Sequence, residues 1–185
     1  MHFFITDFFS DIVENADSSG SRYTDLSIIQ EKENITVTAT DTGTGMGQEE
    51  LQKALDPFYT DGVKHPRRKI GLGLPFLIQA TGMSGGDFSI ASSPGKGTTV
   101  TFSFDLSHVD TPPLGSFPQT FRQILSSGGD SELVITRRRG NVSYRVSRSE
   151  MLTALEELDS AFSQNLLATY LESLEYEGDS QFTLA

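Results

Sequence analysis

Residues 41–46 read Asp-Thr-Gly-Thr-Gly-Met, and this stretch decides how the chain around it is interpreted. Apolar and polar residues alternate from Asn34 to Asp41, which is typical of a half-buried β-strand. Counting back by twos from Asp41, the residues on its face of the strand are Ala39, Val37 and Ile35. Because that face is the apolar one, we expect Asp41 at the end of the buried face, where a carboxylate needs a hydrogen-bond donor.

Two explanations account for this carboxylate. The amino group of an adenine base would supply the donor, and Gly43 and Gly45 would let the backbone come close to such a ligand. Alternatively, Asp41 closes the strand with an Asx turn, in which its side chain binds backbone N–H groups just ahead of it. The residues themselves leave both explanations open.

The residues upstream predict one helix, from Phe4 to Ala16. Its wide apolar face consists of Phe4, Phe8, Ile12 and Ala16, with Ile5, Phe9 and Val13 beside them. Asp11 and Asn15 stand four residues apart, so they share one helix face at the edge of the apolar stripe. An amide oxygen suits Mg²⁺, and a carboxylate one turn away could orient a water. A solvated polar edge is the alternative interpretation.

Glycines and basic residues accompany the next long helix, predicted from Leu72 to Thr81. Its start reads Gly71-Leu72-Gly73-Leu74, where backbone N–H groups and the helix dipole favour an anion. The loop before it, Tyr59 to Lys69, shows no apolar period and contains Lys64, His65, Arg67, Arg68 and Lys69. A basic loop beside a helix N-terminus would form a phosphate clamp, and a solvated loop is again the alternative.

The rest of the pattern predicts a chain of two parts. Before a boundary at residues 110–113 lie a strand at 25–30, a short helix at 49–55 and a hairpin at 88–106 that turns at 93–97. After it follow a helix at 117–125, strands at 132–136 and 143–147 around a turn at 137–141, and two acidic helices. Helices and hairpins in this order, without regular βαβ units, predict an α+β fold with domains at 1–107 and 108–185.

Composition narrows the class of protein. The chain has no cysteine, which excludes disulfides and cysteine-ligated zinc, and its three histidines are scattered. Of the net charge of −11, eight acidic residues lie after Ser149, where no Lys, Arg or His occurs. Such an acidic part disfavours binding to nucleic acid or to an anionic membrane. The apolar residues 1–9 are too short for a signal peptide or a membrane span, so we expect a cytoplasmic protein.

Taken in order, these segments resemble the sequence boxes of the histidine-kinase-like ATPase superfamily, which includes gyrase, Hsp90, histidine kinases and MutL. Residues 11–16 resemble the N box, 41–46 the G1 box, 56–60 the F box, 71–74 the G2 box, and 93–98 the segment that closes the kinase catalytic domain. The resemblance covers roughly residues 4–106. It implies the Bergerat ATP-binding fold, a two-layer α/β sandwich in which helices cover one face of a mixed sheet.

The resemblance implies ATP and Mg²⁺ as ligands and gives residues their roles. Asn15 would ligate Mg²⁺, and Asp11 would act as general base. Asp41, in the same box as Gly43 and Met46, would accept a hydrogen bond from the adenine amino group. Gly45 would admit the base, and Thr98 would support it.

Residues at the phosphate end follow in the same way. Gly71 and Gly73, with Leu72 and Leu74 in the same box, would approach the phosphates next to Lys69. Residues 60–70 would form an ATP lid, and Phe58 would pack under it.

The departures from the family pattern indicate the subtype. Sensor kinases carry Asn where this chain has Asp11, whereas hydrolysing branches carry a carboxylate, usually the longer Glu. Only about ten residues precede the N box, so we expect no dimerisation helix with a phospho-accepting His. Serine kinases of the anti-sigma-factor type share the acid but normally lack an extension like this one. That extension resembles small ATP-binding proteins found beside iron-hydrogenase and NADH-oxidising subunits.

The sequence therefore predicts a Mg-ATP-binding protein that is a slow ATPase or a nucleotide-dependent regulator acting on a protein partner. Two alternatives stay open: a protein kinase that phosphorylates Ser or His of a partner, and a nucleotide sensor without turnover. The oligomeric state is open as well.

Overall fold

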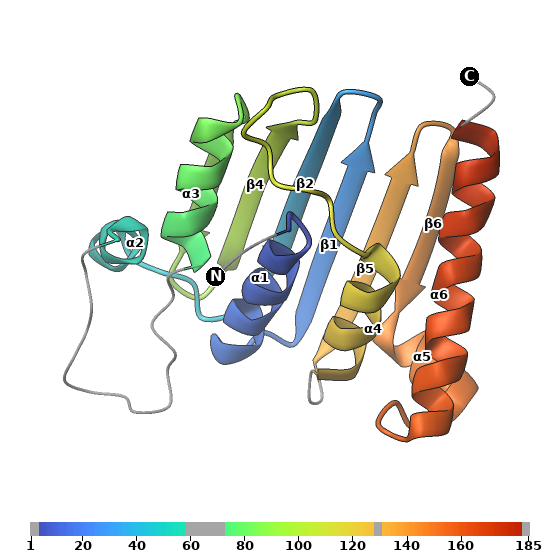
Figure 1. Cartoon of the computed structure of the whole chain (residues 1–185). Coiled ribbons are helices and arrows are strands. Elements are labelled where there is room, and N and C mark those ends of the chain that lie inside the picture. Colours follow the sequence, from blue (N-terminus) through green and yellow to red (C-terminus); the bar gives the residue numbers. More distant parts are fainter. Residues whose placement is uncertain (1–3, 58–72, 128–130, 183–185) are drawn as a thin grey trace.

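The computed structural model describes residues 4–57, 73–127 and 131–182, with side chains described up to residue 176 (Figure 1). Its helices are α1 (Asp7–Ser18), α2 (Gln48–Leu55), α3 (Gly73–Met83), α4 (Phe117–Ser127), α5 (Arg148–Leu155) and α6 (Ala161–Phe182). Its strands are β1 (Tyr23–Gln30), β2 (Asn34–Asp41), β3 (Phe88–Ser93), β4 (Gly97–Asp105), β5 (Glu132–Arg139) and β6 (Val142–Ser147). The six strands form one mixed sheet in the order β3-β4-β2-β1-β5-β6.

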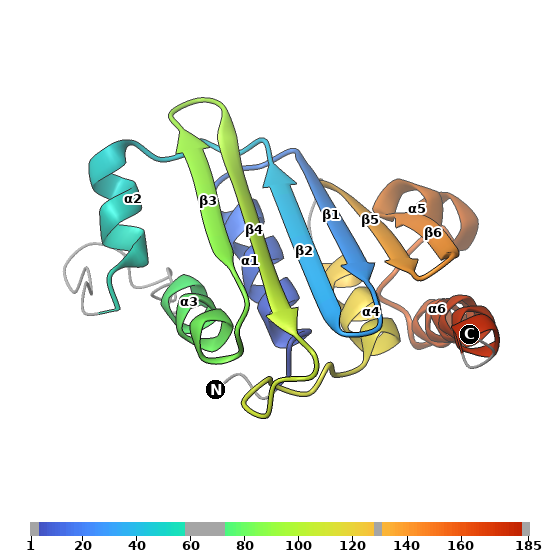
Figure 2. The same ribbon diagram turned by 90° about the horizontal axis from the view of Figure 1, so that it is seen from above.

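Helices α1, α3, α4 and α6 lie on one face of this sheet (Figure 2). The periodicity of the strands explains the arrangement, because the residues of β2 that face the helices are Ile35, Val37 and Ala39, all buried. The opposite face is polar. On it, threonine hydroxyls of β2 and β4 form hydrogen bonds across the strands, Thr38 with Thr101 and Thr40 with Thr99, each at 3.2 Å between the oxygens. The predicted α+β fold, a mixed sheet covered by helices on one face, is confirmed.

Aromatic side chains form the centre of the core between helices and sheet. Phe9 of α1 lies 6.5 Å from Phe102 and 6.0 Å from Phe117, measured between ring centroids. Phe102 meets Phe104 edge to face at 5.9 Å. Each such pair contributes about 0.5–1.5 kcal/mol beyond the burial of its surface. These contacts hold α1 against β4 on one side and against α4 on the other.

The C-terminal part of the chain extends the same sheet. Strand β5 pairs in parallel with β1, from Tyr23 opposite Glu132 to Gln30 opposite Arg139, while the other strand pairs are antiparallel. Buried residues of α4, β5 and α6 belong to the same hydrophobic cluster as those of α1 and β2. Residues 1–107 and 108–185, which the sequence divided into two domains, thus share one sheet and one core in the described residues. We call residues 108–182 the extension.

Several element boundaries differ from the sequence predictions, two of them by three residues. Helix α1 begins at Asp7 and not at Phe4, because Ile5 and Thr6 donate backbone hydrogen bonds to the carbonyls of Pro113 and Leu114 in the segment that returns from β4. Strand β5 continues to Arg139, although residues 137–141 were predicted as a turn. Across the described residues, no helix has both the length and the apolar character needed to span a membrane.

Candidate nucleotide site

Helix α1 and the residue that caps its C-terminus carry three polar side chains at four-residue spacing. Its apolar face packs on the sheet through Phe8, Ile12 and Val13, which leaves Asp11 half-buried and Asn15 exposed at its edge. Ser19 follows as the residue that ends the helix. Residues at positions i, i+4 and i+8 lie on nearly one line, so Asp11, Asn15 and Ser19 form a row about 12 Å long at 1.5 Å per residue.

The first residue of this row contacts α3. Gly73, the first described residue of α3, is buried, and a Cβ added there would lie 2.5 Å from Oδ2 of Asp11 and 3.1 Å from its Cβ. The carboxylate of Asp11 therefore lies against the N-terminal turn of α3. Leu74 is half-buried and packs against the core, so its role here is to anchor α3.

The last residue of the row contacts the loop after β2. A Cβ on Gly43 would lie 1.8 Å from Oγ of Ser19, and the N–H of Thr44 donates to the Ser19 carbonyl at 3.0 Å. Glycine at position 43 is therefore required by packing of this loop on the end of α1. The sequence had assigned this glycine to close approach of a ligand and had missed Ser19.

Asp41 ends β2 on the helix-covered face and is half-buried. Its Oδ1 accepts the N–H of Gly43 at 2.7 Å, so the Asx turn considered from the sequence is present. Burial raises the pKa of this carboxyl above its ordinary value of 3.8, although backbone hydrogen bonds from Gly43 and Thr98 oppose the rise. An ionised carboxylate has about four acceptor positions, so the turn and an adenine amino group can both be served.

The loop of residues 42–47 packs on the turn between β3 and β4. Gly45 has a φ of +64°, and a Cβ there would lie 2.0 Å from the carbonyl oxygen of Ser93. Gly97 has a φ of +83°, and its Cβ would lie 1.9 Å from the carbonyl oxygen of Asp41. Protein contacts thus account for both glycines. Admission of an adenine base beside Gly45 stays a prediction.

Ser92 is a site residue that the sequence analysis missed. Its Oγ accepts the N–H of Met46 at 2.9 Å, donates to the carbonyl of Gly97 at 3.1 Å and pairs with Oγ1 of Thr98 at 2.9 Å. Thr98 lies opposite Asp41 in the register of β2 and β4. Ser92 and Thr98 therefore hold the loop with Met46 beside the end of β2. The register across the turn at residues 93–97, which places Ser92 opposite Thr98, was the signal that could have identified it.

Four predicted site residues, Phe58, Lys69, Gly71 and Leu72, and the predicted lid at 60–70 lie outside the described residues. Over the described ranges, no three His, Cys, Asp or Glu side chains come together as a metal site. The exposed amide of Asn15 still fits Mg²⁺, because this ion keeps several waters and binds through one or two protein ligands together with phosphates.

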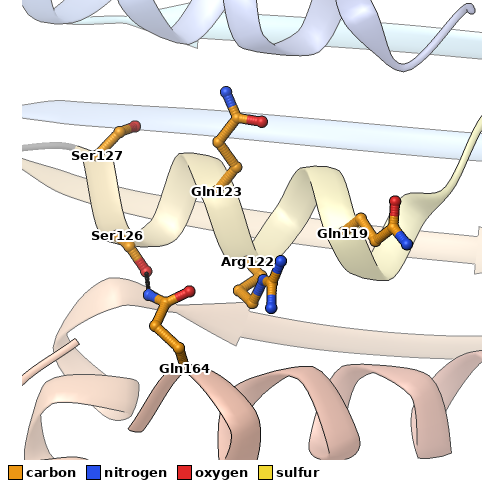
Figure 3. Close-up of a pocket in the computed structure, with 6 residues that line it drawn as sticks. All are labelled: Gln119, Arg122, Gln123, Ser126, Ser127 and Gln164. Atoms are coloured by element: carbon orange, nitrogen blue, oxygen red, sulfur yellow. Dashed lines mark hydrogen bonds between the residues drawn. The ribbon is translucent and has the colours of Figure 1, made fainter. Parts of the chain in front are cut away.

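A groove of about 450 Å³ lies elsewhere, between α4 and α6, as Figure 3 shows. Its lining consists of Gln119, Arg122, Gln123, Ser126, Ser127 and Gln164, and the Gln164 amide donates to Oγ of Ser126 at 2.7 Å. None of these residues belongs to α1, α3 or the loop after β2. We therefore do not include the groove in the nucleotide site.

Comparison with known proteins identifies the family of the chain. No curated protein matches the chain. Among solved structures, the nucleotide-free catalytic domain of the histidine kinase ThkA matches at 18% identity and a TM-score of 0.42, over 57% of this chain and 66% of that one. The family of histidine kinase-, DNA gyrase B- and HSP90-like ATPases matches residues 4–108. Because this match spans more than half of the chain, the protein belongs to that family, whose domains bind ATP.

Proposed function

We propose that this protein binds ATP with Mg²⁺, hydrolyses it slowly, and changes a surface seen by a protein partner. The observation that carries the proposal is the row Asp11, Asn15 and Ser19 on α1. One end of the row touches the start of α3, and the other touches the loop that follows Asp41. A nucleotide lying along this row would have its base at Asp41, its metal at Asn15 and its phosphates at the N-terminus of α3.

Each end of this row suits the group assigned to it. A helix N-terminus favours the negative charge of phosphates. A carboxylate at the other end accepts the 6-amino group of adenine, whereas guanine has an oxygen there and would face it acceptor to acceptor. Mg²⁺ would neutralise charge on the phosphates, and Asn15 would hold it.

Asp11 is the candidate general base for hydrolysis. Its carboxylate lies at the N-terminal turn of α3, where we place the terminal phosphate, and it shares a helix face with Asn15. A carboxylate there can accept a proton from an attacking water. Asp is one methylene shorter than the Glu usual in hydrolysing relatives, and this shorter reach is consistent with slow turnover.

Contacts at the end of α1 link the site to the extension. Oγ of Ser131 donates to Asp17 of α1 at 2.7 Å, and the Arg148 guanidinium donates to Oγ of Ser131 at 2.8 Å. Arg148 also donates to the carbonyls of Leu125 and Ile124 at 2.9 and 2.8 Å, so it caps the C-terminus of α4. A movement of α1 on nucleotide binding would therefore act on α4, which supports a role for the extension in signalling to a partner.

Incubation of the pure protein with γ-labelled ATP and Mg²⁺ tests the proposal. Release of labelled phosphate that Asp11→Asn slows would support hydrolysis at this site. Label retained on protein would favour the kinase alternative instead. If ATP binds but neither product forms, the chain is a nucleotide sensor, and the hydrolysis part of the proposal is wrong.

A further inference from the structure

Helix α6 has a second apolar face that no described element covers. Its buried face consists of Leu167, Leu171 and, partly, Leu174, which pack on the core. Exposed Phe162, Leu166 and Tyr170 follow at four-residue spacing along the side of the helix next to this face, and Tyr176 lies six residues further on. Phe162 and Tyr176 are 73% and 75% exposed, and the other two are 43% exposed. We call these four residues the α6 stripe.

The α6 stripe is more than the usual scatter of exposed apolar residues. At about 150–250 Å² for a whole aromatic side chain, its exposed parts amount to roughly 400–500 Å². That is as large as the largest apolar patch on a typical monomer, which is often functional. It is well below the approximately 800 Å² per partner of a stable protein–protein interface. One amphipathic helix of a partner, with contacts at its rim, matches this size.

Acidic residues determine the character of that partner. The exposed side chains of Glu157, Asp159 and Glu172 lie just before the stripe or on its helix, and the sequence has no basic residue after Arg148. A second copy of this chain would bring the same acids face to face, and like charges across an interface cost affinity. An anionic lipid surface would be repelled in the same way. A helix with Lys or Arg beside its apolar residues is attracted.

We propose that the α6 stripe docks a basic amphipathic helix of a protein partner. Apolar residues of that helix pack on Phe162, Leu166 and Tyr170, and its basic residues face Glu157, Asp159 and Glu172. This inference rests on the partner part of the proposed function and needs no nucleotide turnover. Helix α6 packs on α4, which Arg148 and Ser131 connect to Asp17 of α1, so the docking face is connected to the nucleotide site.

The test uses a fluorescent designed peptide with Leu on one helical face and Lys on the other. A peptide of identical composition in scrambled order serves as its control. Anisotropy should show that the full chain binds the amphipathic peptide more tightly than the scrambled one. The double variant Phe162→Ser and Tyr170→Ser should lose at least about tenfold in affinity, since aromatic anchors dominate such interfaces.

Matched variants separate the stripe from general effects. Met83→Ser removes an exposed apolar side chain of α3, 55% exposed, and should bind the peptide like the parent. Glu157→Gln with Glu172→Gln should reduce the salt dependence of binding. Circular dichroism and ATP affinity, both unchanged in the stripe variant, show that the fold and the nucleotide site are intact. A parent protein that binds the peptide but not ATP would instead contradict the proposed function and leave the docking inference standing.

Three results would overturn the inference. The first is equal binding of the amphipathic and the scrambled peptide. The second is a stripe variant that binds the peptide as tightly as the parent. The third is a parent that dimerises in sedimentation experiments while the stripe variant stays monomeric, because a second copy would then be the occupant.

Discussion

Asp41→Asn tests the adenine end of the site, because it replaces one carboxylate oxygen by an amide N–H₂ group of nearly the same size. The Asp41 carboxylate accepts the N–H of Gly43 at 2.7 Å and a backbone hydrogen bond from Thr98, and it has acceptor positions left for an amino group. Asn has a single acceptor oxygen, which Gly43 would keep. Its amide N–H₂ would then face the amino group of adenine, donor to donor.

The expected loss of ATP affinity follows from this exchange. A hydrogen bond to a charged acceptor contributes about 1.5–3 kcal/mol, which corresponds to an affinity roughly ten- to hundredfold lower. Isothermal titration calorimetry with ATP and GTP measures it. Asp87→Asn, at an exposed aspartate just before β3, is the matched control and should bind ATP like the parent.

The raised pKa of Asp41 predicts the pH dependence. Burial disfavours the ionised form, so the carboxyl becomes protonated at a higher pH than an ordinary aspartate, and ATP affinity should begin to fall there as the pH is lowered. A pKa that is raised in the folded state also means that ionisation of this carboxyl lowers the free energy of unfolding as the pH rises through that pKa. Equal affinity of the parent for ATP and GTP, or unchanged ATP affinity of Asp41→Asn, would refute the assignment.

Three further changes test other parts of the structure. Asn15→Ala should abolish the Mg²⁺-dependent part of ATP binding, measured by calorimetry with and without chelator. Asp11→Asn should leave binding largely intact and slow phosphate release by about 10²–10⁴, as expected for loss of a general base; parent-like rates in both variants would place the phosphates elsewhere. Arg148→Met should lower the free energy of unfolding by about 2–4 kcal/mol in urea titrations, because it uncaps α4 and leaves buried carbonyls unpaired. Arg145→Met, which breaks an exposed ion pair, should change it by less than about 1 kcal/mol.

Local patterns sufficed to predict much of the fold. Strand β2 begins and ends at the predicted residues, Asn34 and Asp41, because alternation of apolar and polar side chains is complete along it. The hairpin of β3 and β4 forms around the predicted turn at residues 93–97. Both signals come from residues close together in sequence.

Features that depend on distant residues could not be predicted in this way. Strand β5 joins β1 across about a hundred residues, and no turn motif marks a parallel pairing of this length. Arg137 looks like a turn residue in sequence but is only 2% exposed. Its guanidinium donates to Glu175 of α6 and to Gln30 of β1, and it lies 3.8 Å above the ring of Phe117. The buried charge has partners on three separate elements, α6, β1 and α4. Its burial therefore depends on the assembled fold and cannot be predicted from the local sequence.

Helix α1 is the element through which the two proposals meet. The row on one of its faces touches the two ends of the nucleotide site, while Asp17 and Phe9 on other faces contact Ser131 and Phe117 of the extension. A rigid helix cannot shift one face without the others, and packed cores adopt discrete arrangements instead of deforming gradually. If both proposals hold, one coupling free energy links binding of Mg-ATP to binding of a partner at α6. Because such coupling is reciprocal, the factor by which ATP changes the affinity for the partner must equal the factor by which the partner changes the affinity for ATP.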